Sequence, residues 1–476
     1  MSVDAVLGNR VGSIVAPAGC GKTHLITDVL AVPQDKPYLV LTHTTAGVAA
    51  LKTRLANLDI PKSNYRIQTI DGWTLKLARM FPLRSGFSVP ASGVIQYPAL
   101  QSAAAQLCSN GDLFEVLQAT YSRLLVDEYQ DCNADQHRSI VGLSRCLPTS
   151  VFGDPMQTLF NFEQGTHPSW DLHVETVFPR MLELTTPWRW NKALEPEFGQ
   201  WVLGVRSEFM AGRNIDLRMG PKNVTWIQKP QEPQEVKKLQ LVTQQHIRRD
   251  MAAGETMLVI GDSSRAESRH GFARDAAGIG VVERVDLPDL LEYTQQIEGR
   301  TPAEVLELTL EVVSSLMTGV DRSTLSPRVK TILLGRNRTP PSKVESAACS
   351  LATTGSNTFI SELFHQLEAK PGTRIYRGAA YYALKDAINI SLNDENLSLH
   401  SAMTMVRERR RHAGERRIPQ LAIGSTLLLK GLEADHVLIL DTRNSYGYVM
   451  NRDNLYVALS RGAKSITVIS ESPVLG

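Results

Sequence analysis

Short apolar runs alternate with longer amphipathic stretches along the first half of the chain. Helical spacing of the apolar positions predicts helices from Gly21 to about Leu30 and over Thr45–Leu58. The short apolar runs between such stretches have the length of buried strands. We predict strands at Gly12–Ala16, Tyr38–Thr42, Leu124–Val126, Val151–Gly153 and Leu182–Thr185. Strands that alternate with helices in this way are typical of a parallel sheet covered by helices.

A second pattern of the same kind follows a predicted helix from Asn191 to about Ala211. It contains a helix at Pro233–Met251 and predicted strands at Val224–Ile227, Met257–Gly261, Leu421–Leu429, Val437–Asp441 and Ile466–Ile469. The alternation lapses at about 74–119, where helical pieces flank a Pro/Gly/Ser-rich stretch, and at about 287–417, which is mostly helical. We therefore predict an α/β protein with two parallel-sheet domains, 1–190 and 191–476, each interrupted by a mostly helical insertion.

Composition narrows the functional classes. At 476 residues the chain is too long for one compact core. No stretch approaches about 18 uninterrupted apolar residues, so we expect no membrane span. The N-terminus lacks the pattern of a secretory signal, which favours a cytoplasmic protein. The five cysteines are scattered and predict neither a disulfide framework nor a zinc site. Because the net charge is only +2, any nucleic-acid site must be a local groove.

The segment Ala16–Thr23 (APAGCGKT) lies between a predicted strand and a predicted helix. Glycines there let backbone N–H groups turn inward, and the helix N-terminus adds the positive end of its dipole, so the segment is suited to binding phosphates. Lys22 would reach the β- and γ-phosphates of ATP and Thr23 would bind Mg²⁺. The strict pattern has glycine where this chain has Ala16, and the alternative is a glycine-rich turn with an incidental lysine. The residues expected to bind the nucleotide here are Ala18, Gly19, Cys20, Gly21, Lys22, Thr23 and His24.

An acidic pair follows the predicted strand Leu124–Val126 directly. Carboxylates at the carboxyl end of a parallel strand face ligands bound at that edge of the sheet. Asp127 is the expected Mg²⁺ ligand, and Glu128 is the expected base that orients the attacking water. The alternative is a solvated acidic turn, which the pairing with the phosphate loop makes less favourable.

Six segments, taken together, carry a family resemblance. They follow one another in a fixed order: Ala16–Thr23, Asp127–Asp131 (DEYQD), Val151–Gln157 (VFGDPMQ), Thr186–Arg189 (TPWR), Lys430–Glu433 (KGLE) and Tyr456–Arg461 (YVALSR). Each is short, but their order resembles that of the motifs of UvrD/Rep-type superfamily 1 helicases. The resemblance implies two RecA-like domains that bind ATP and Mg²⁺, each with an insertion.

The resemblance also implies roles for side chains in the later motifs. Gln157 would sense the γ-phosphate, and Arg189 would reach the same phosphate. Trp188 would stack on the adenine, and Glu433 would bind the ribose. Arg461 would supply a second arginine from the second domain, so that hydrolysis depends on closure between the domains.

The expected nucleic-acid path is defined less sharply. Phe160 and Phe162 occupy places where the family has a tyrosine and a base-stacking tryptophan, and Trp73 is a further aromatic for the same path. The alternative for the two phenylalanines is core packing. Three further residues are expected on the path: Thr42, His43 and Thr69. The basic run 407–417 is a possible phosphate contact, although a solvated helix face explains it as well.

These features predict an ATP-dependent translocase or helicase that acts on single-stranded or partly duplex DNA. The DEYQD segment favours 3′–5′ movement, although the VALSR wording also occurs in the superfamily 1 branch that moves the opposite way. One alternative is a DNA-sensing regulatory ATPase that partners a nuclease, since the compact chain resembles accessory subunits of bacterial anti-phage systems such as the Gabija type. Another alternative is an RNA-directed motor.

Overall fold

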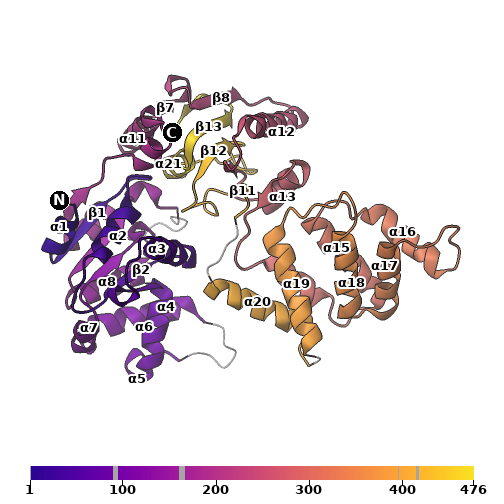
Figure 1. Ribbon diagram of the computed structural model, residues 1–476, viewed down its shortest axis with the longest axis horizontal. Helices are drawn as coiled ribbons and strands as arrows, with labels where there is room; N and C mark the ends of the chain where they lie inside the picture. The colour runs from indigo at the N-terminus through magenta and orange to yellow at the C-terminus, as the bar shows by residue number, and fades with distance from the viewer. Residues whose placement is uncertain (1, 89–94, 160–166, 395, 414–417) are drawn as a thin grey trace. The chain divides into compact units, whose positions relative to one another are not determined.

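The computed structural model describes residues 2–88, 95–159, 167–394, 396–413 and 418–476, without the side chains of 411–413. The predicted base-stacking residues Phe160 and Phe162 lie outside these described residues. The chain forms two compact units (Figure 1). The first comprises Met1–Val224, Met450–Lys464 and Val474–Gly476, and the second comprises Thr225–Val449 and Ser465–Pro473.

The first unit is built on a six-stranded parallel sheet with the order β3-β2-β4-β5-β1-β6. Its strands are β1 (Val11–Val15), β2 (Tyr38–Thr42), β3 (Tyr65–Thr69), β4 (Leu124–Val126), β5 (Thr149–Gly153) and β6 (Arg180–Glu183). Successive residues of a strand point to opposite faces, and both faces of this sheet are apolar. Tyr38 and Val40 of β2 enter one core, whereas Leu39 and Leu41 enter the other. A strand buried on both faces reads as a continuous apolar run, which explains why β1, β2 and β4 were predictable.

Helices cover both faces of this sheet. Three of them pack into the core on the Tyr38 side: α1 (Ser2–Gly8), α2 (Lys22–Ala31) and α3 (Thr45–Asn57). The opposite core receives α4 (Ile70–Met80), α6 (Tyr97–Ser109), α7 (Phe114–Thr120) and α8 (Ala134–Ser144), and the short α5 is Pro82–Ser85. The described part of the predicted insertion at 74–119 is mostly helical, and its helices α4, α6 and α7 cover a face of the sheet. Trp73 is 2% exposed in this core.

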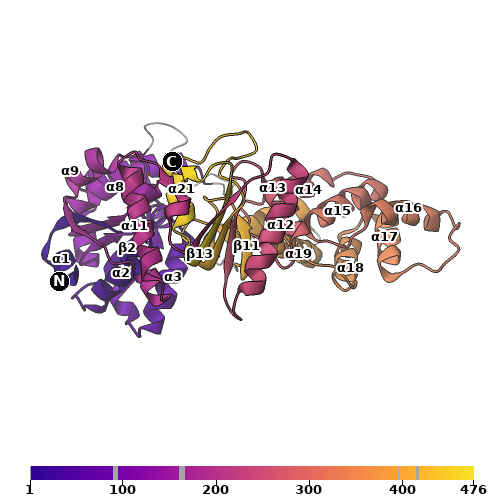
Figure 2. The same ribbon diagram turned by 90° about the horizontal axis from the view of Figure 1, so that it is seen from above.

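The second unit contains another six-stranded sheet, with the order β10-β11-β9-β12-β13-β8. Its strands are β8 (Val224–Gln228), β9 (Met257–Ile260), β10 (Gly280–Val281), β11 (Leu421–Gly424), β12 (Ala434–Ile439) and β13 (Gly462–Ser470). Neighbours from β10 through β12 pair in parallel. Helices α12 (Pro233–Asp250) and α13 (Ala266–Asp275) pack against this sheet (Figure 2). The predicted α/β class with two sheets is confirmed.

A helical insertion separates β10 from β11 and has a hydrophobic core of its own. Its helices are α14 (Pro288–Gln296), α15 (Pro302–Leu316), α16 (Arg322–Leu333), α17 (Lys343–Thr354), α18 (Asn357–Glu368), α19 (Gly378–Asn393) and α20 (Leu399–Ala413). The breaks at 334–342 and 369–377 include the polar stretches visible in the sequence.

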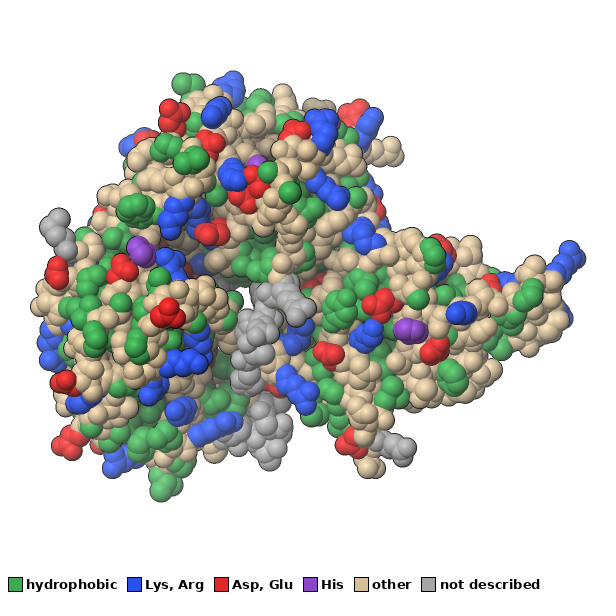
Figure 3. Space-filling model, viewed as in Figure 1, with side chains coloured by type: hydrophobic (Ala, Val, Ile, Leu, Met, Phe, Trp, Pro, Cys, Tyr) green, Lys and Arg blue, Asp and Glu red, His purple; other side chains and the backbone are tan. Residues whose placement is uncertain are grey.

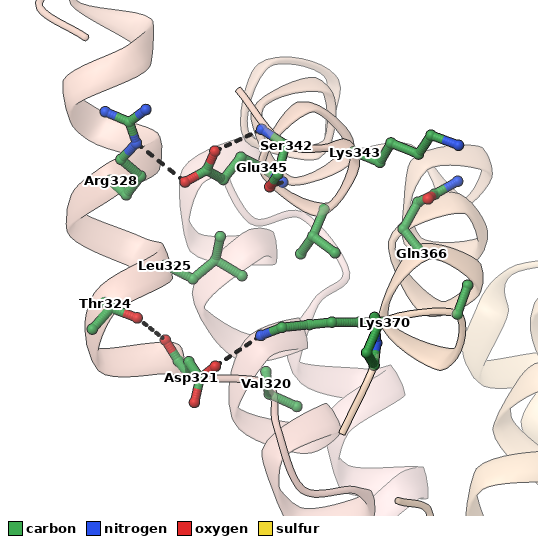
Figure 4. A pocket seen from close by; sticks show the side chains of 13 residues that line it. Val320, Asp321, Thr324, Leu325, Arg328, Ser342, Lys343, Glu345, Gln366 and Lys370 are labelled. Atoms are coloured by element: carbon green, nitrogen blue, oxygen red, sulfur yellow. Dashed lines mark hydrogen bonds and ion pairs between the residues drawn. The ribbon is translucent and has the colours of Figure 1, made fainter. Parts of the chain in front are cut away.

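A cavity of about 590 Å³ lies on the surface of this insertion, beside α16, α17 and the end of α18 (Figure 4). The Lys370 ammonium is 2.7 Å from the Asp321 carboxylate, and the Arg328 guanidinium is 3.1 Å from the Glu345 carboxylate. These charges neutralise one another within the cavity wall, so we assign both pairs to the packing of the insertion.

The two units differ in range from the domains predicted as 1–190 and 191–476. Helix α11 (Pro196–Met210) and helix α21 (Arg452–Leu459) both lie in the first unit and pack against each other. The antiparallel pair β7 (Ile215–Asp216) and β14 (Val474–Leu475) also joins this unit. The apolar pattern of α21 does not indicate its unit, because five consecutive apolar residues, Leu455–Leu459, are buried, and a helix that is apolar all round can pack in either core.

Lys and Arg side chains are interspersed with Asp and Glu side chains over the face seen in Figure 3, in keeping with the net charge of +2. No helix in the described part of the chain combines the length and the apolar character needed to cross a bilayer.

Candidate nucleotide-binding site

The loop Ala16–Thr23 joins the end of β1 to the start of α2 at the carboxyl edge of the first sheet. Gly19 and Gly21 have φ angles of 70° and 93°, a backbone region that side chains disfavour. A Cβ atom on Gly19 would lie 2.7 Å from the ring of Trp190, and one on Gly21 would lie 3.0 Å from the ring of Trp188. Glycine is therefore required at both positions, and the loop has the backbone geometry of a phosphate cradle.

Lys22 lies opposite the acidic pair at the end of β4. Its ammonium is 2.9 Å from the Asp127 carboxylate and also forms an ion pair with Glu128. Burial alone would lower the pKa of Lys22, but attraction by Asp127 and Glu128 outweighs burial and raises the pKa above its ordinary value. Lys22 therefore stays charged, which its predicted role in phosphate binding requires.

The backbone of Glu128 is strained. Its φ of 55° lies in the left-handed region, which costs a residue other than glycine on the order of 1–3 kcal/mol. The Asp127 carboxylate accepts a hydrogen bond from the Glu128 N–H at 2.9 Å, and the Asp131 N–H donates to the Glu128 carbonyl oxygen at 3.0 Å. Such strain persists where surrounding contacts fix a side chain for function, and here it turns Glu128 toward the phosphate loop.

A chain of hydrogen bonds runs from Glu128 along the edge of the sheet. The Gln130 amide donates to Glu128 Oε2 at 2.6 Å and accepts from the Asp154 N–H at 3.2 Å. The Asp154 carboxylate accepts from the Gln157 amide at 3.0 Å and from the Arg206 guanidinium at 3.0 Å. Arg206 is on α11 and offsets the charge of the buried Asp154.

Helix α21 and the turn after it complete this group of side chains. The Ala18 N–H of the phosphate loop donates to the Tyr456 hydroxyl at 3.0 Å. The Arg461 guanidinium donates to Gln157 Oε1 at 2.9 Å, and the Arg189 guanidinium donates to the Ser460 carbonyl oxygen. Arg461 therefore lies in the first unit, where sequence reasoning placed it in the second. The buried contacts of Tyr456 and Arg461 account for the difference, since neither could be deduced from spacing along the chain.

The remaining residues predicted to bind nucleotide are placed as follows. Thr23 is half-buried in the first turn of α2, and the side chain of His24 is exposed. Trp188 is 49% exposed and lies beside Gly21. Cys20 is buried, and burial followed by the nearby Asp154 charge raises the pKa of its thiol to about 12. Glu433 lies in the second unit, exposed in the segment before β12.

The residues expected on a nucleic-acid path differ in burial and in their contacts. Thr42 is buried at the end of β2, and Thr69 caps α4 by accepting a hydrogen bond from the Gly72 N–H at 3.0 Å. His43 is partly buried, with its Nε2 3.3 Å from the sulfur of Cys132. The assignment of Trp73 to the path needs correction, because its ring packs in the core and offers no face to a base.

The arrangement fits a nucleoside triphosphate with Mg²⁺. The cradle glycines, a charged lysine and a helix N-terminus suit phosphates, and Thr23 with Asp127 offers the oxygen ligands that Mg²⁺ prefers. Sequence reasoning assigned no role to Gln130, Asp154, Tyr456 or Arg206. The first three belong to the segments DEYQD, VFGDPMQ and YVALSR, so their position in these motifs could have identified them. Arg206 belongs to none of the motifs.

The sheet, the phosphate loop and the acidic pair define the class of P-loop nucleotide-binding proteins. Residues 88–171 match the model of the UvrD/REP helicase N-terminal domain, the family described as UvrD-helicase. This match confirms the resemblance to UvrD/Rep-type superfamily 1 helicases that the motifs indicated. No curated protein matches the chain significantly in sequence.

Solved helicase structures are similar to the chain at low identity. They include an arterivirus nonstructural protein 10 in complex with DNA (9% identity, TM-score 0.35), a crystal structure of arterivirus nonstructural protein 10 (9%, 0.36) and the PRRSV helicase (10%, 0.36). Each similarity covers 98% of this chain, but 62%, 61% and 54% of the respective helicase. The chain therefore spans less than two thirds of the length of these proteins.

Proposed function

We propose that the chain is an ATP-driven translocase that moves along single-stranded DNA in the 3′–5′ direction, with Mg²⁺ as its metal. The observation that carries this proposal is the convergence of Lys22, Glu128, Gln157 and Arg461 in one connected group at the edge of the first sheet. A plain nucleotide-binding fold needs only the first two. Gln157 and Arg461 add the γ-phosphate sensing expected of a motor of the UvrD/Rep type.

In this proposal, individual side chains of the site have separate roles in ATP hydrolysis. Lys22 and the loop N–H groups bind and orient the phosphates, while Thr23 and Asp127 hold Mg²⁺, which neutralises phosphate charge. Glu128 orients the attacking water and takes its proton. Gln157 detects the terminal phosphate and passes its state to Arg461 through their 2.9 Å hydrogen bond. Positioned cations and donors of this kind account for most of the rate enhancement in phosphoryl transfer.

Hydrolysis measured with different strands tests the proposal. Phosphate release with MgATP is expected to rise about tenfold or more when single-stranded DNA is added, since a translocase couples turnover to its track. Single-stranded RNA and blunt duplex DNA should stimulate less. Equal stimulation by RNA would replace DNA with an RNA track, and no stimulation by any strand would overturn the motor function.

Direction is tested by displacement of streptavidin from biotinylated oligonucleotides. A 3′–5′ translocase moves toward the 5′ end, so streptavidin should leave a 5′-biotin faster than a 3′-biotin. Faster loss from the 3′ end would reverse the direction. Displacement that needs no ATP would not reflect movement at all.

Arg461 is expected to act mainly on turnover. Arg461→Lys keeps the charge but loses the forked geometry that reaches Gln157 and the Val457 carbonyl oxygen. We expect kcat to fall by about 10- to 100-fold, which corresponds to the loss of one charge-assisted hydrogen bond. The Michaelis constant for ATP should change little. Steady-state kinetics with saturating DNA measure both values.

Arg377→Lys is the matched control for this variant. Arg377 is also buried and paired, with Glu283 and Asp289, but it lies in the second unit. An equal loss of kcat in both variants would assign the effect of Arg461 to general stability.

A further inference from the structure

The Gln130 side chain is held between Glu128 and the end of β5. Its side chain is 6% exposed, and both ends of its amide are hydrogen-bonded. A Cβ atom on Gly153 would lie 2.6 Å from the Gln130 Oε1 atom and 2.7 Å from the ring of Trp170. The missing side chain at Gly153 therefore leaves the space that the amide fills.

Two different groups contact the two oxygens of the Glu128 carboxylate. Lys22 pairs with Oε1, and the Gln130 amide donates to Oε2 at 2.6 Å. Lys22 must turn to the phosphates when a nucleotide binds, as the proposed function requires. The Gln130 contact does not depend on Lys22, because the amide is fixed at its other end by the Asp154 N–H.

We propose that Gln130 is a positioning residue that holds the Glu128 carboxylate toward the attacking water. This inference rests on the proposed hydrolysis and adds a residue to it. A donor that is itself fixed at its other end gives the carboxylate one orientation, and a general base acts only within hydrogen-bond reach of the proton that it takes. Through Asp154 the same amide links the base to Gln157, so the orientation of the base follows the γ-phosphate sensor.

The test is the steady-state kinetics of Gln130→Met at saturating single-stranded DNA. Methionine has a similar length, but it neither donates to Glu128 nor accepts from the Asp154 N–H, so the Glu128 carboxylate loses the contact that fixes its direction. We expect kcat to fall about tenfold and the Michaelis constant for ATP to change little, because the lost contact orients the base and does not bind the nucleotide.

Gln136→Met provides a closely matched control. The Gln136 side chain is 7% exposed, donates to the Asp71 carboxylate at 3.0 Å and accepts from the Asn133 N–H at 3.1 Å. This variant removes one donated and one accepted hydrogen bond elsewhere in the same unit. It should keep the wild-type kcat.

Two results would contradict the positioning role of Gln130 and leave the proposed function intact. They are an equal loss of kcat in both variants and an unchanged kcat in Gln130→Met. Absence of strand-stimulated hydrolysis in the wild type would overturn both the role and the function. If Gln130→Met fails to fold, Gln130→Glu can still accept from the Asp154 N–H but has no donor for Glu128, so its kcat should also fall while the Michaelis constant for ATP changes little. An unchanged kcat in that variant would overturn the inference equally.

Discussion

Replacement of Lys22 by alanine is expected to abolish nucleotide hydrolysis, with a loss of about 10³-fold or more in kcat. The phosphate loop carries the Lys22 ammonium, which faces Asp127 and Glu128, and a loose phosphoryl-transfer transition state depends on such cations for charge stabilisation. Phosphate release at saturating DNA measures the loss. Nucleotide binding, followed with a fluorescent ATP analogue, should weaken as well, because the lysine contacts the phosphates before the reaction.

Lys229→Ala separates this effect from the loss of an ion pair. Lys229 lies in the second unit and also contacts two carboxylates, that of Asp441 at 2.6 Å and that of Glu471 at 3.8 Å. Both variants should lose similar thermal stability, while only Lys22→Ala loses hydrolysis. Near-normal strand-stimulated turnover in Lys22→Ala would refute the site assignment.

The sheet of the first unit shows what the apolar pattern can predict. Strands β2 and β4 match their predicted bounds because they are buried on both faces, and such runs stand out in a sequence. Strand β3 was missed because it lies at the edge of the sheet, where only Tyr65 and Ile67 of its five residues are buried. Its residues alternate between apolar and polar, but only two apolar positions carry the pattern, and so short a run does not stand out in the sequence.

The sequence likewise predicted the local features of the candidate site but not the contacts between its strands. Residues fixed by local geometry, such as Gly19, Gly21 and Lys22, could be read from one loop. The link from Gln130 to Asp154 depends on which strand lies beside β4 in the sheet, which the sequence does not state. Trp73 illustrates the reverse error, because an aromatic ring near a motif suits base stacking and core packing equally well until its neighbours are known.

Glu128→Gln is expected to keep ATP binding and to lose turnover by about 10²–10⁴-fold, the usual contribution of a general base. The amide has the size of the carboxylate, so the strained backbone and the contact with Gln130 should survive, but it cannot accept the proton of the attacking water. Single-turnover hydrolysis and equilibrium ATP binding measure the two effects separately. Glu345→Gln is the matched control, since Glu345 also pairs one oxygen with a cation, Arg328 at 3.1 Å, and the other with an N–H group, that of Ser342 at 2.7 Å. That control should hydrolyse ATP like the wild type. If Glu128→Gln kept more than about a tenth of wild-type turnover, the base would have to be another group, and the strain at Glu128 would need a purely structural explanation.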